Sequence, residues 1–510
     1  MATLITLDNY LSVDTNNLTS VKIDSNVTSD VFSIFISKVL PNLTSLDCAG
    51  CNNITSIPVI PNLITLVCSK CKLLTSIPDL PNLTSLDCHS CDRLKCIPYL
   101  SNLTYLDCSK CKLLTSIPDL HGLVDLYCDF CVRLNVLPDL PKLITLDCCE
   151  CIGLTRIPYL PNLKSLSCHS CIHLTSIPDL PNLTYLDCQW CKLLTRIPLF
   201  RDLTTLYCYM CVGLTSIPDL PNLTSLNCDW CELLTTIPYL PKLTTLHCDC
   251  CDRLKVIPYL PNLIYLDCNS CKGLTGIHGL PNLTELNCHS CDMLTVIPYL
   301  SNLNSLNCYQ CERLTSIPDL PNLITLRCYS CYMLTSIPSL PSLTTLSCAD
   351  CILLTSIPIL YNLTNLNCDW CNQLTGIPDL PNLIDLSCRY CNRLISIAEL
   401  PNLTNLNCDM CELLTIIPEL PKLTSLNCSE CTQLNSIPMF PNLKILNNEI
   451  VTHQINIDTV LSIVGDSECI ICYSCENVYE TKCGHTFHKD CLDTWLEAHC
   501  ECPYCRSIII

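Results

Sequence analysis

The chain has 510 residues, including 51 cysteines, and a formal net charge of −19 at pH 7. That negative charge argues against a nucleic-acid partner, because phosphates select basic surfaces. No apolar run approaches the length of a membrane span, and residues 1–11 lack the basic and apolar regions of a signal peptide. We therefore expect an intracellular, cytoplasmic protein that binds neither nucleic acid nor membranes.

Residues 1–40 precede a regular pattern and are expected to form its N-terminal cap. Leu18, Val21 and Ile23 have the apolar spacing of an irregular first repeat. The stretch 29–40 opens with Ser-Asp, a pair that favours a helix start, and continues with apolar residues at helical spacing. The sequence predicts a capping helix over this stretch.

Twenty repeats of 20 residues follow, from Pro41 to Phe440, without an insertion. The pattern is clearest over residues 81–100, which read P-N-L-T-S-L-D-C-H-S-C-D-R-L-K-C-I-P-Y-L. Leu46 and Cys48 alternate with polar residues, as in a short strand with one buried face. The later I-P-x-L-P segment cannot be helical, because prolines lack an amide donor and bias the preceding residue to extended geometry. Each repeat is expected to be a strand, a turn and an extended return.

A single repeat is too small to fold alone. About six apolar side chains contribute roughly 2 kcal/mol each, against an ordering cost of roughly 1.5 kcal/mol for every residue. Stacked neighbours must supply the remainder, so the repeats should form one continuous array. We predict a mainly β solenoid over residues 41–446, with parallel strands about 4.8 Å apart. Such a sheet offers a platform for a macromolecule.

The repeat also resembles a known family. Leu43, Leu46 and Cys48 are followed by Cys51 and Ile54, a spacing that resembles the cysteine-containing leucine-rich repeat. The resemblance covers about four-fifths of the chain. It implies a parallel β-sheet on the concave face and extended, polyproline-like segments on the convex face.

Two cysteines recur at every twentieth residue, from Cys48 and Cys51 to Cys428 and Cys431. On spacing alone, adjacent repeats could form four-thiolate zinc sites or disulfides. We favour buried free thiols, because the first cysteine lies on the buried face of the strand. The second occupies a place where leucine-rich repeats hydrogen-bond loop carbonyls, and a thiol is a small apolar group with a weak donor.

Aromatic and acidic residues alternate at the outward positions of the repeats. The tyrosines are Tyr105, Tyr185 and Tyr265, the acids are Asp87, Asp107, Asp147 and Asp187, and Trp190, Trp230 and Trp370 are expected at strand ends. This combination favours a polar, partly cationic protein partner. Neutral divergence at solvent-facing positions is the alternative.

The repeat pattern ends before the last domain. Residues 441–446 are half a repeat, and residues 447–468 lose the pattern altogether, as expected for a cap or linker. A Cys/His cluster then fills residues 469–510 in the order C-x2-C-x10-C-x-H-x2-H-x2-C-x10-C-x2-C. Its members are Cys469, Cys472, Cys483, His485, His488, Cys491, Cys502 and Cys505.

This cluster resembles a RING finger of the two-histidine subtype. The resemblance implies two Zn²⁺ ions held by interleaved ligand pairs. It assigns to the first zinc Cys469, Cys472, His488 and Cys491, and to the second zinc Cys483, His485, Cys502 and Cys505. Four protein ligands close each site, so the ions would be structural, and so short a domain needs them to fold.

Two further cysteines complicate the ligand assignment. Cys475 makes a second C-x2-C pair with Cys472, and Cys500 lies just before Cys502. Either could carry ubiquitin as a nucleophile, but neither has an evident partnered base. A tandem zinc finger for nucleic acid is a weaker alternative, because the domain has no basic helix.

Four other residues match those that RING ligases use on a ubiquitin-conjugating enzyme charged with ubiquitin. Ile471, Trp495 and Pro503 would line the apolar groove that binds this enzyme, and Arg506 would be the linchpin that hydrogen-bonds both proteins. The plain alternative is that the first two are core residues and Pro503 shapes the zinc loop.

The resemblance implies a RING-type E3 ubiquitin transferase that catalyses by positioning, with a protein substrate bound on the solenoid. A non-catalytic zinc-stabilised interaction scaffold is the alternative. Uniform repeats beside a RING also resemble proteins of large DNA viruses, for which the location would be the host cell cytoplasm.

Overall fold

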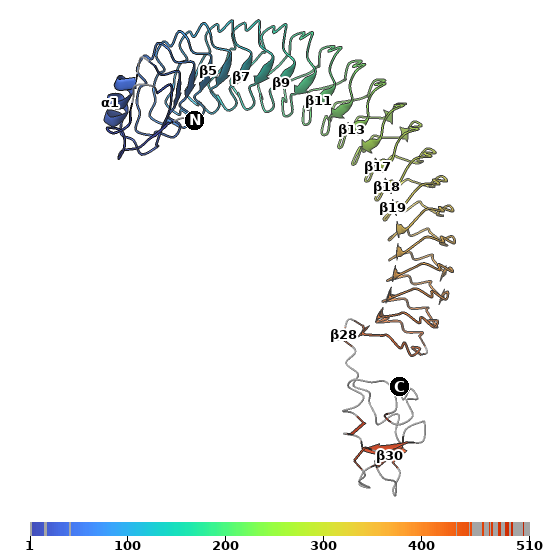
Figure 1. Ribbon diagram of the computed structural model, residues 1–510. Coiled ribbons are helices and arrows are strands. Elements are labelled where there is room, and N and C mark those ends of the chain that lie inside the picture. Colours follow the sequence, from blue (N-terminus) through green and yellow to red (C-terminus); the bar gives the residue numbers. More distant parts are fainter. Residues whose placement is uncertain are drawn as a thin grey trace. The chain divides into compact units, whose positions relative to one another are not determined.

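The computed structural model describes residues 3–14, 18–39, 42–434, 436–447, 449–450, 462–463, 469, 471–472, 478–480, 485–488, 491–492 and 503 (Figure 1). Most of the predicted linker at 447–468 lies outside these residues. The chain forms two compact parts, Met1–Leu323 and Ile324–Ile510, called here the N-terminal part and the C-terminal part. Within the described ranges, no helix combines the length and apolar character that crossing a bilayer requires.

The N-terminal part opens with two strands that precede the regular repeats. β1 (Thr3–Ile5) pairs in parallel with β2 (Ser20–Ile23), and β2 pairs in parallel with β3 (Ser45–Asp47). Val21 and Ile23 are buried, as expected for an irregular first repeat. The pairing of β1 extends the sheet by one strand that the sequence pattern did not predict.

The predicted capping helix is confirmed as α1 (Ser29–Val39). Phe32, Phe35, Ile36 and Val39 are all buried, so the helix covers apolar surface with one face. The cap residue lies one position earlier than expected. The carbonyl oxygen of Thr28 accepts the hydrogen bond from the Phe32 amide at 2.9 Å, which makes Thr28 the first flanking residue.

One strand in each repeat then builds a parallel sheet. After β3, the strands are β4 (Thr65–Val67), β5 (Ser85–Asp87), β6 (Tyr105–Asp107), β7 (Asp125–Tyr127), β8 (Thr145–Asp147), β9 (Ser165–Ser167), β10 (Tyr185–Asp187), β11 (Thr205–Tyr207), β12 (Ser225–Asn227), β13 (Thr245–His247), β15 (Tyr265–Asp267), β17 (Glu285–Asn287) and β18 (Ser305–Asn307). Each residue lies opposite its equivalent in the next repeat, for example Leu86 opposite Leu106. The predicted parallel β-solenoid is therefore confirmed.

Seven side chains in each repeat before the last fill the interior between the sheet and the return segments. In the repeat 81–100 they are Leu83, Leu86, Cys88, Cys91, Leu94, Ile97 and Leu100, each at most 5% exposed. The residues on either side of Leu86 face outward and are partly exposed. The core is thus a column of apolar side chains that runs along the array.

Polar side chains add hydrogen bonds between successive repeats. The amide nitrogen Nδ2 of Asn82 donates to the carbonyl oxygen of Pro61 at 2.8 Å, and the thiol of Cys91 donates to the carbonyl oxygen of Cys68 at 3.1 Å. Equivalent bonds recur along the array. The described cysteines are free thiols, as predicted, and the second cysteine of most repeats donates to a carbonyl oxygen of the preceding repeat, as Cys271 does to Cys248 and Cys411 to Cys388.

The turn after each strand contains a residue in the left-handed conformation. From Lys70 to Glu430 this residue is never glycine, and its φ lies between 53° and 61°. Trp190, Trp230 and Trp370 occupy this position, three residues beyond the strand rather than at its end. The conformation costs roughly 1–2 kcal/mol per residue. Hydrogen bonds between neighbouring turns hold it, as when the amide of Trp190 donates to the next repeat.

The C-terminal part continues the same architecture. Its sheet strands are β19 (Thr325–Arg327), β20 (Thr345–Ser347), β21 (Asn365–Asn367), β23 (Asp385–Ser387), β25 (Asn405–Asn407), β26 (Ser425–Asn427), β27 (Ile445–Leu446) and β28 (Glu449–Ile450). They pair in parallel as far as β27, and β28 pairs with β27 in the antiparallel sense.

Contrary to the prediction, the return segments are not unpaired throughout: isolated bridges such as that between Ser56 and Ser76 occur, and two pairs of short strands form. β14 (Val256–Ile257) pairs with β16 (Gly276–Ile277), and β22 (Gly376–Ile377) pairs with β24 (Ser396–Ile397). In each pair the second strand is followed by His278 or Ala398 where most repeats have proline. Their amides donate to the carbonyl oxygens of Ile257 and Ile377, both at 3.0 Å. A proline has no amide donor for this bond.

Candidate metal centre

A small antiparallel sheet positions the C-terminal Cys/His cluster. β29 (Ser462–Ile463) pairs with β30 (Val478–Glu480), which pairs with β31 (Thr486–His488). His488 is the last residue of β31, next to the fully buried Phe487. The sheet thus fixes the backbone of one candidate ligand beside a small apolar core.

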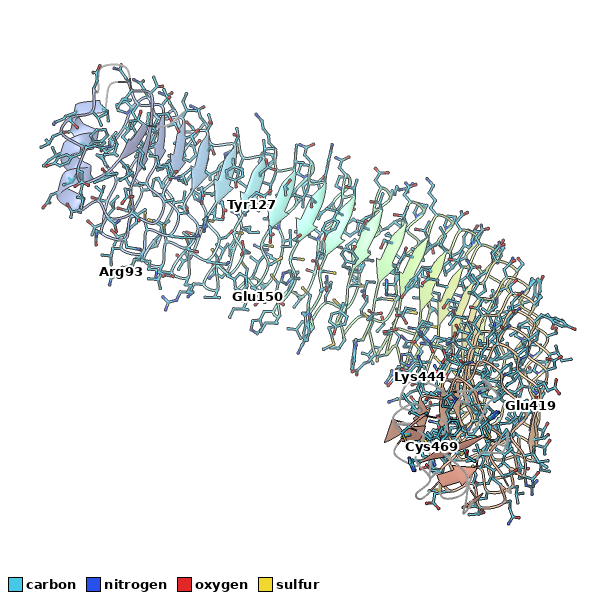
Figure 2. The ribbon with its side chains drawn as sticks, turned by 60° about the horizontal axis from the view of Figure 1, so that its bottom comes forward. Arg93, Tyr127, Glu150, Glu419, Lys444 and Cys469 are labelled. Atoms are coloured by element: carbon cyan, nitrogen blue, oxygen red, sulfur yellow. The ribbon has the colours of Figure 1, made fainter. Side chains whose placement is uncertain are left out.

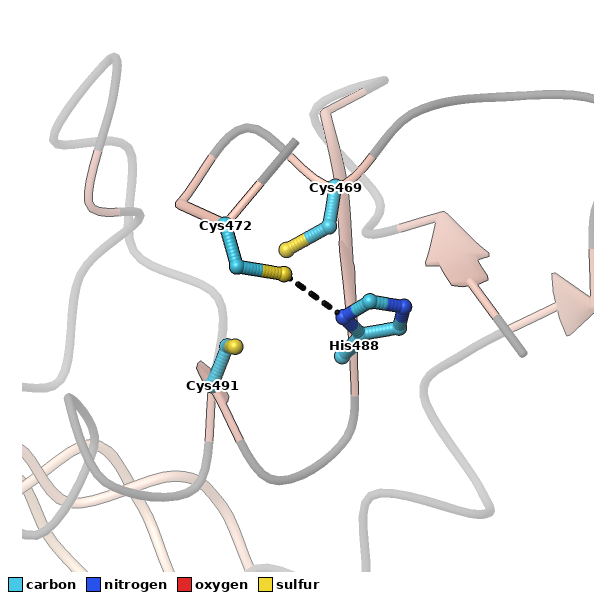
Figure 3. A group of neighbouring side chains, drawn as sticks. All are labelled: Cys469, Cys472, His488 and Cys491. Atoms are coloured by element: carbon cyan, nitrogen blue, oxygen red, sulfur yellow. Dashed lines mark hydrogen bonds between the residues drawn. The ribbon is translucent and has the colours of Figure 1, made fainter. Parts of the chain in front are cut away.

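Four candidate ligands come together around one point (Figure 3). They are Cys469, Cys472, His488 and Cys491, whose ligand atoms all lie within 4.8 Å of one another. The thiol sulfur of Cys472 and the Nδ1 atom of His488 are hydrogen-bonded at 2.9 Å. Cys469 is buried, Cys472 is exposed, and the other two are partly buried. The ligand atoms therefore converge at a place that is partly open to solvent.

The thiols in this group have shifted pKa values. Burial alone would raise the pKa of Cys469, but hydrogen bonds from the backbone of His488, Cys472 and Ile471 and from the Cys472 thiol lower it to about 7. Burial, followed by the thiols of Cys472 and Cys469, raises the pKa of Cys491 to about 11. A cation at the centre would reverse the second shift, because it stabilises every thiolate around it.

This donor set fits a zinc ion. Zinc prefers tetrahedral sulfur and nitrogen ligands, with Zn–S of about 2.3 Å and Zn–N of about 2.0 Å, which separates the ligand atoms by roughly 3.5–3.8 Å. The observed grouping within 4.8 Å needs only small side-chain adjustments to reach that geometry. Three thiolates and one imidazole would leave no open position on the ion, so it would serve the fold.

The remaining predicted site residues are only partly described. His485 is partly buried, Ile471 is 42% exposed, and Pro503 is partly exposed. The other residues singled out in this domain lie outside the described residues: Cys475, Cys483, Trp495, Cys500, Cys502, Cys505 and Arg506. The grouping expected at the second zinc and the complete groove therefore stay predictions.

A second group of possible ligands lies on the solenoid and was not predicted. Asp87, His89 and Asp107 have ligand atoms within 4.8 Å of one another, and Nδ1 of His89 lies 2.8 Å from Oδ1 of Asp87. The sequence feature that could have predicted this group is the outward position of its residues on adjacent repeats. Within the described ranges, the paired cysteines of the repeats form no such group. The four-thiolate alternative for the repeats therefore has no geometric support.

Residues 467–506 match the family model for the Ring finger domain. Over 53 residues the chain is 45% identical to RING-H2 finger protein ATL7 of Arabidopsis thaliana, an overlap of 9% of this chain and 22% of the relative. Two relatives from the same plant are named E3 ubiquitin-protein ligases. ATL59 is 42% identical over 52 residues (9% of this chain, 23% of the relative), and ATL6 is 48% identical over 48 residues (8% and 12%).

The chain thus spans less than a quarter of the length of these curated relatives. No solved structure matches the chain significantly. Sequence likeness and side-chain geometry agree on the short C-terminal segment. Residues 467–506 are therefore a RING finger domain with a zinc-binding Cys/His cluster, and they follow a parallel β-solenoid of cysteine-containing repeats.

Proposed function

We propose that this chain is a RING-type ubiquitin-protein ligase. The RING finger recruits a ubiquitin-conjugating enzyme, and the solenoid recruits the protein substrate. The observation that carries the proposal is the match of residues 467–506 to the Ring finger domain, together with the convergence of four ligands inside that segment. Two relatives that share this segment are named E3 ubiquitin-protein ligases.

Two zinc ions hold the proposed ligase domain together. The first binds the converging group of Cys469, Cys472, His488 and Cys491. The second binds Cys483, His485, Cys502 and Cys505, whose order in the sequence alternates with that of the first set. Because all ligand positions are taken by the protein, neither ion activates water or substrate.

The proposed contact surface for the conjugating enzyme includes residues next to the ligands of both zincs in the sequence. Ile471 lies between two ligands of the first zinc and is 42% exposed, so its side chain is available to a partner. Trp495 and Pro503 complete the apolar groove, and Arg506 hydrogen-bonds both the enzyme and ubiquitin. Burial of one such apolar side chain contributes roughly 1.5–3 kcal/mol to binding.

The proposed chemistry is aminoacyl transfer without a nucleophile on this chain. A substrate lysine amine attacks the thioester carbonyl at the C-terminus of ubiquitin, an isopeptide bond forms, and the cysteine thiolate of the conjugating enzyme leaves. The RING contributes by holding the thioester in an attack-ready geometry beside the substrate, which removes part of the entropic barrier.

Reconstituted autoubiquitination tests this proposal. The full chain, with ubiquitin, activating enzyme, ATP and a panel of conjugating enzymes, should form ubiquitin conjugates. Ile471→Ala should lower the rate roughly tenfold or more, because it removes an apolar contact of the size given above. Arg506→Ala should also strongly lower the rate of conjugate formation. Ile384→Ala is the matched control, because Ile384 is also 42% exposed but lies on the solenoid.

Measuring the zinc content of the same samples shows whether a variant is inactive only because it has lost its metal. Both RING variants should retain their metal, since neither residue is a proposed ligand. If the zinc-loaded wild type forms no conjugate with any conjugating enzyme, the ligase proposal is wrong and the interaction scaffold is the better account.

A further inference from the structure

A Tyr-Leu-Asp strand recurs at every fourth position of the sheet in the N-terminal part. The three strands are β6, β10 and β15. Among all described strands, tyrosine opens only these three. The leucine of each is buried, while the tyrosine and the aspartate lie on the outward face of the sheet. The solenoid therefore presents the same pair of side chains three times at even spacing.

A second aromatic ring lies against the tyrosine at each place. The ring centroids of Tyr105 and Tyr127 are 5.7 Å apart. Those of Tyr185 and Tyr207 are 5.9 Å apart, and those of Tyr265 and His247 are 5.1 Å apart. Figure 2 shows Tyr127 beside the strands, whereas Arg93 and Glu150 lie on the turns. Each site thus combines two rings with a carboxylate on one face of the sheet.

The carboxylates of these sites have no lysine or arginine partner among the described residues. In the part of the chain that the structure describes, no lysine or arginine forms an ion pair with Asp107, Asp187 or Asp267. Histidine rings are the basic groups near these carboxylates. The ring of His89 lies 3.9 Å from Asp107, while His169 interacts electrostatically with Asp187 and His289 with Asp267. The Oδ1 atom of Asp267 is buried without a hydrogen-bond partner. A cation brought by another molecule would not have to displace a lysine or arginine already paired with these carboxylates in the described part of the chain.

The pKa values of the three tyrosines also indicate a negative potential at these sites. Burial, and then the aspartate two residues further along, raises the pKa of each to about 12; the three residues are Tyr105, Tyr185 and Tyr265. The phenols stay neutral at physiological pH, and an aromatic ring face attracts a cation. The phenol oxygen of Tyr265 also lies 3.4 Å from Oδ2 of Asp267, so hydroxyl and carboxylate share one site.

We propose that these three sites bind an extended basic segment of a protein, with one arginine or lysine side chain at each site. Four strand spacings of about 4.8 Å separate successive sites by roughly 19 Å. An extended chain rises about 3.3 Å per residue, so the cationic side chains would be about six residues apart. An even separation places them on the same side of the bound segment. This inference rests on the proposed recruitment of substrate by the solenoid, and it names the chemical class recruited.

The test measures binding of synthetic peptides to the full chain by fluorescence anisotropy. One peptide carries three arginines about six residues apart in a Gly/Ser/Thr background, and a second has the same composition with the arginines adjacent. The spaced peptide should bind at least about tenfold more tightly, because only it reaches all three sites at once. Its affinity should fall as salt rises.

The matching protein variant carries Asp107→Asn, Asp187→Asn and Asp267→Asn. An asparagine oxygen can still accept the hydrogen bond of the following turn, as Oδ1 of Asn227 does from the amide of Asp229 at 3.1 Å. The control carries the same charge change at Asp79, Asp139 and Asp179, which are exposed on the return segments. The first variant should bind the spaced peptide roughly tenfold more weakly, and the control should bind like the wild type.

Two outcomes would overturn the inference. Equal losses in both variants would mean that the peptide responds only to net charge. Equal binding of the two peptides would mean that the even spacing is only a trace of repeat duplication. The assay uses no ubiquitin, so it is independent of the ligase proposal. Peptide binding by a chain without ligase activity would refute that proposal and leave this one intact.

Discussion

The second cysteine of each repeat combines apolar packing with a hydrogen bond. Cys111 is fully buried, and its thiol donates to the carbonyl oxygen of Cys88 at 3.2 Å. The first cysteine of a repeat has a raised pKa, whereas a reactive thiol has a lowered one. Its hydrogen bond with Cys131, followed by burial, raises the pKa of Cys108 well above the ordinary value. Such thiols remain protonated and are poor nucleophiles.

Alkylation of the folded protein should therefore be selective. Exposed Cys96 should react readily with iodoacetamide, while the buried cysteine pairs should not react before unfolding. Cys431 and Cys250 are both partly buried, but their alkylation rates should depend on pH in different ways. The hydrogen bond with Cys408 lowers the pKa of Cys431 to about 7, whereas burial raises the pKa of Cys250 to about 11.

The thiolate is the reacting form, so the sign of each shift gives the pH dependence. The Cys431 rate should approach its plateau above about pH 8, where the thiolate predominates, while the Cys250 rate should keep rising towards pH 11. Peptide mass spectrometry of the alkylated protein gives both rates. Urea-unfolded protein, in which all thiols should react alike, is the control. Labelling of the buried pairs at the Cys96 rate in the folded state would contradict the burial argument.

The sequence predicted the buried positions of the repeat but not its left-handed turn. Alternation around Leu86 and the spacing of Cys88 and Cys91 define the interior, because burial selects residue type directly. At the turn position, lysine, tryptophan, methionine and glutamate all occur, as at Lys70, Trp190 and Met210. No residue preference marks the conformation there, since hydrogen bonds between stacked repeats impose it on any side chain.

At the scale of single elements, α1 is the cap that keeps the first apolar layer away from water. Phe35 is fully buried, so Phe35→Ala should cost about 3–5 kcal/mol of local stability. Repeats contact only their neighbours, so the loss should be confined to the nearest ones. Hydrogen-exchange mass spectrometry should show faster exchange in β2 and β3 and no change in the C-terminal part.

Ile34→Ala is the control for this change. Ile34 belongs to the same helix but is 46% exposed, so its truncation should alter stability by no more than about 0.5 kcal/mol. Faster exchange throughout the chain in the Phe35 variant would show that the solenoid unfolds as one cooperative body rather than repeat by repeat.

The strand, turn and return of each repeat were predictable because alternation and proline each restrict the backbone locally. The two-stranded pairs at β14–β16 and β22–β24 were not predicted. Their signal was present, since His278 and Ala398 replace a proline that recurs elsewhere, and only a residue with an amide can donate to the preceding repeat. Strand β1 lacks the repeat pattern, so its pairing could be found only in the folded structure.

At the scale of the whole chain, two kinds of stabilisation operate side by side. The solenoid relies on stacked apolar columns and hydrogen bonds, and within the described residues its cysteines form no metal-binding group. The RING finger relies on bound zinc, because so short a domain buries little apolar surface. Their responses to metal removal should therefore differ.

Chelation of zinc should abolish ubiquitin transfer while leaving the β-sheet signal in far-ultraviolet circular dichroism and the thermal unfolding of the solenoid unchanged. Re-addition of zinc should restore transfer. A chelator already saturated with zinc is the control for direct effects of the compound. Melting of the solenoid on chelation would mean that the repeat cysteines bind metal after all.

The sequence predicted the group of possible metal ligands in the RING finger, but it did not predict the group on the solenoid. The resemblance to RING fingers implied which residues should meet at the first zinc, and the folded chain brings Cys469, Cys472, His488 and Cys491 together. Burial was not predictable, because it depends on how β31 and Phe487 pack. The solenoid group of Asp87, His89 and Asp107 was missed because its members come from two repeats and meet only through sheet register.

The unbroken register of the repeats also bears on how such a gene can change. Every internal repeat meets the same two faces on its neighbours, so a slip during replication that adds or removes one whole copy leaves each new junction identical to the old ones. The array can therefore lengthen or shorten between generations without breaking the register of its sheet. Such an event between Tyr105 and Tyr265 would shift the distance between two tyrosine-bearing strands by one strand spacing, and so alter which ligands the protein can hold.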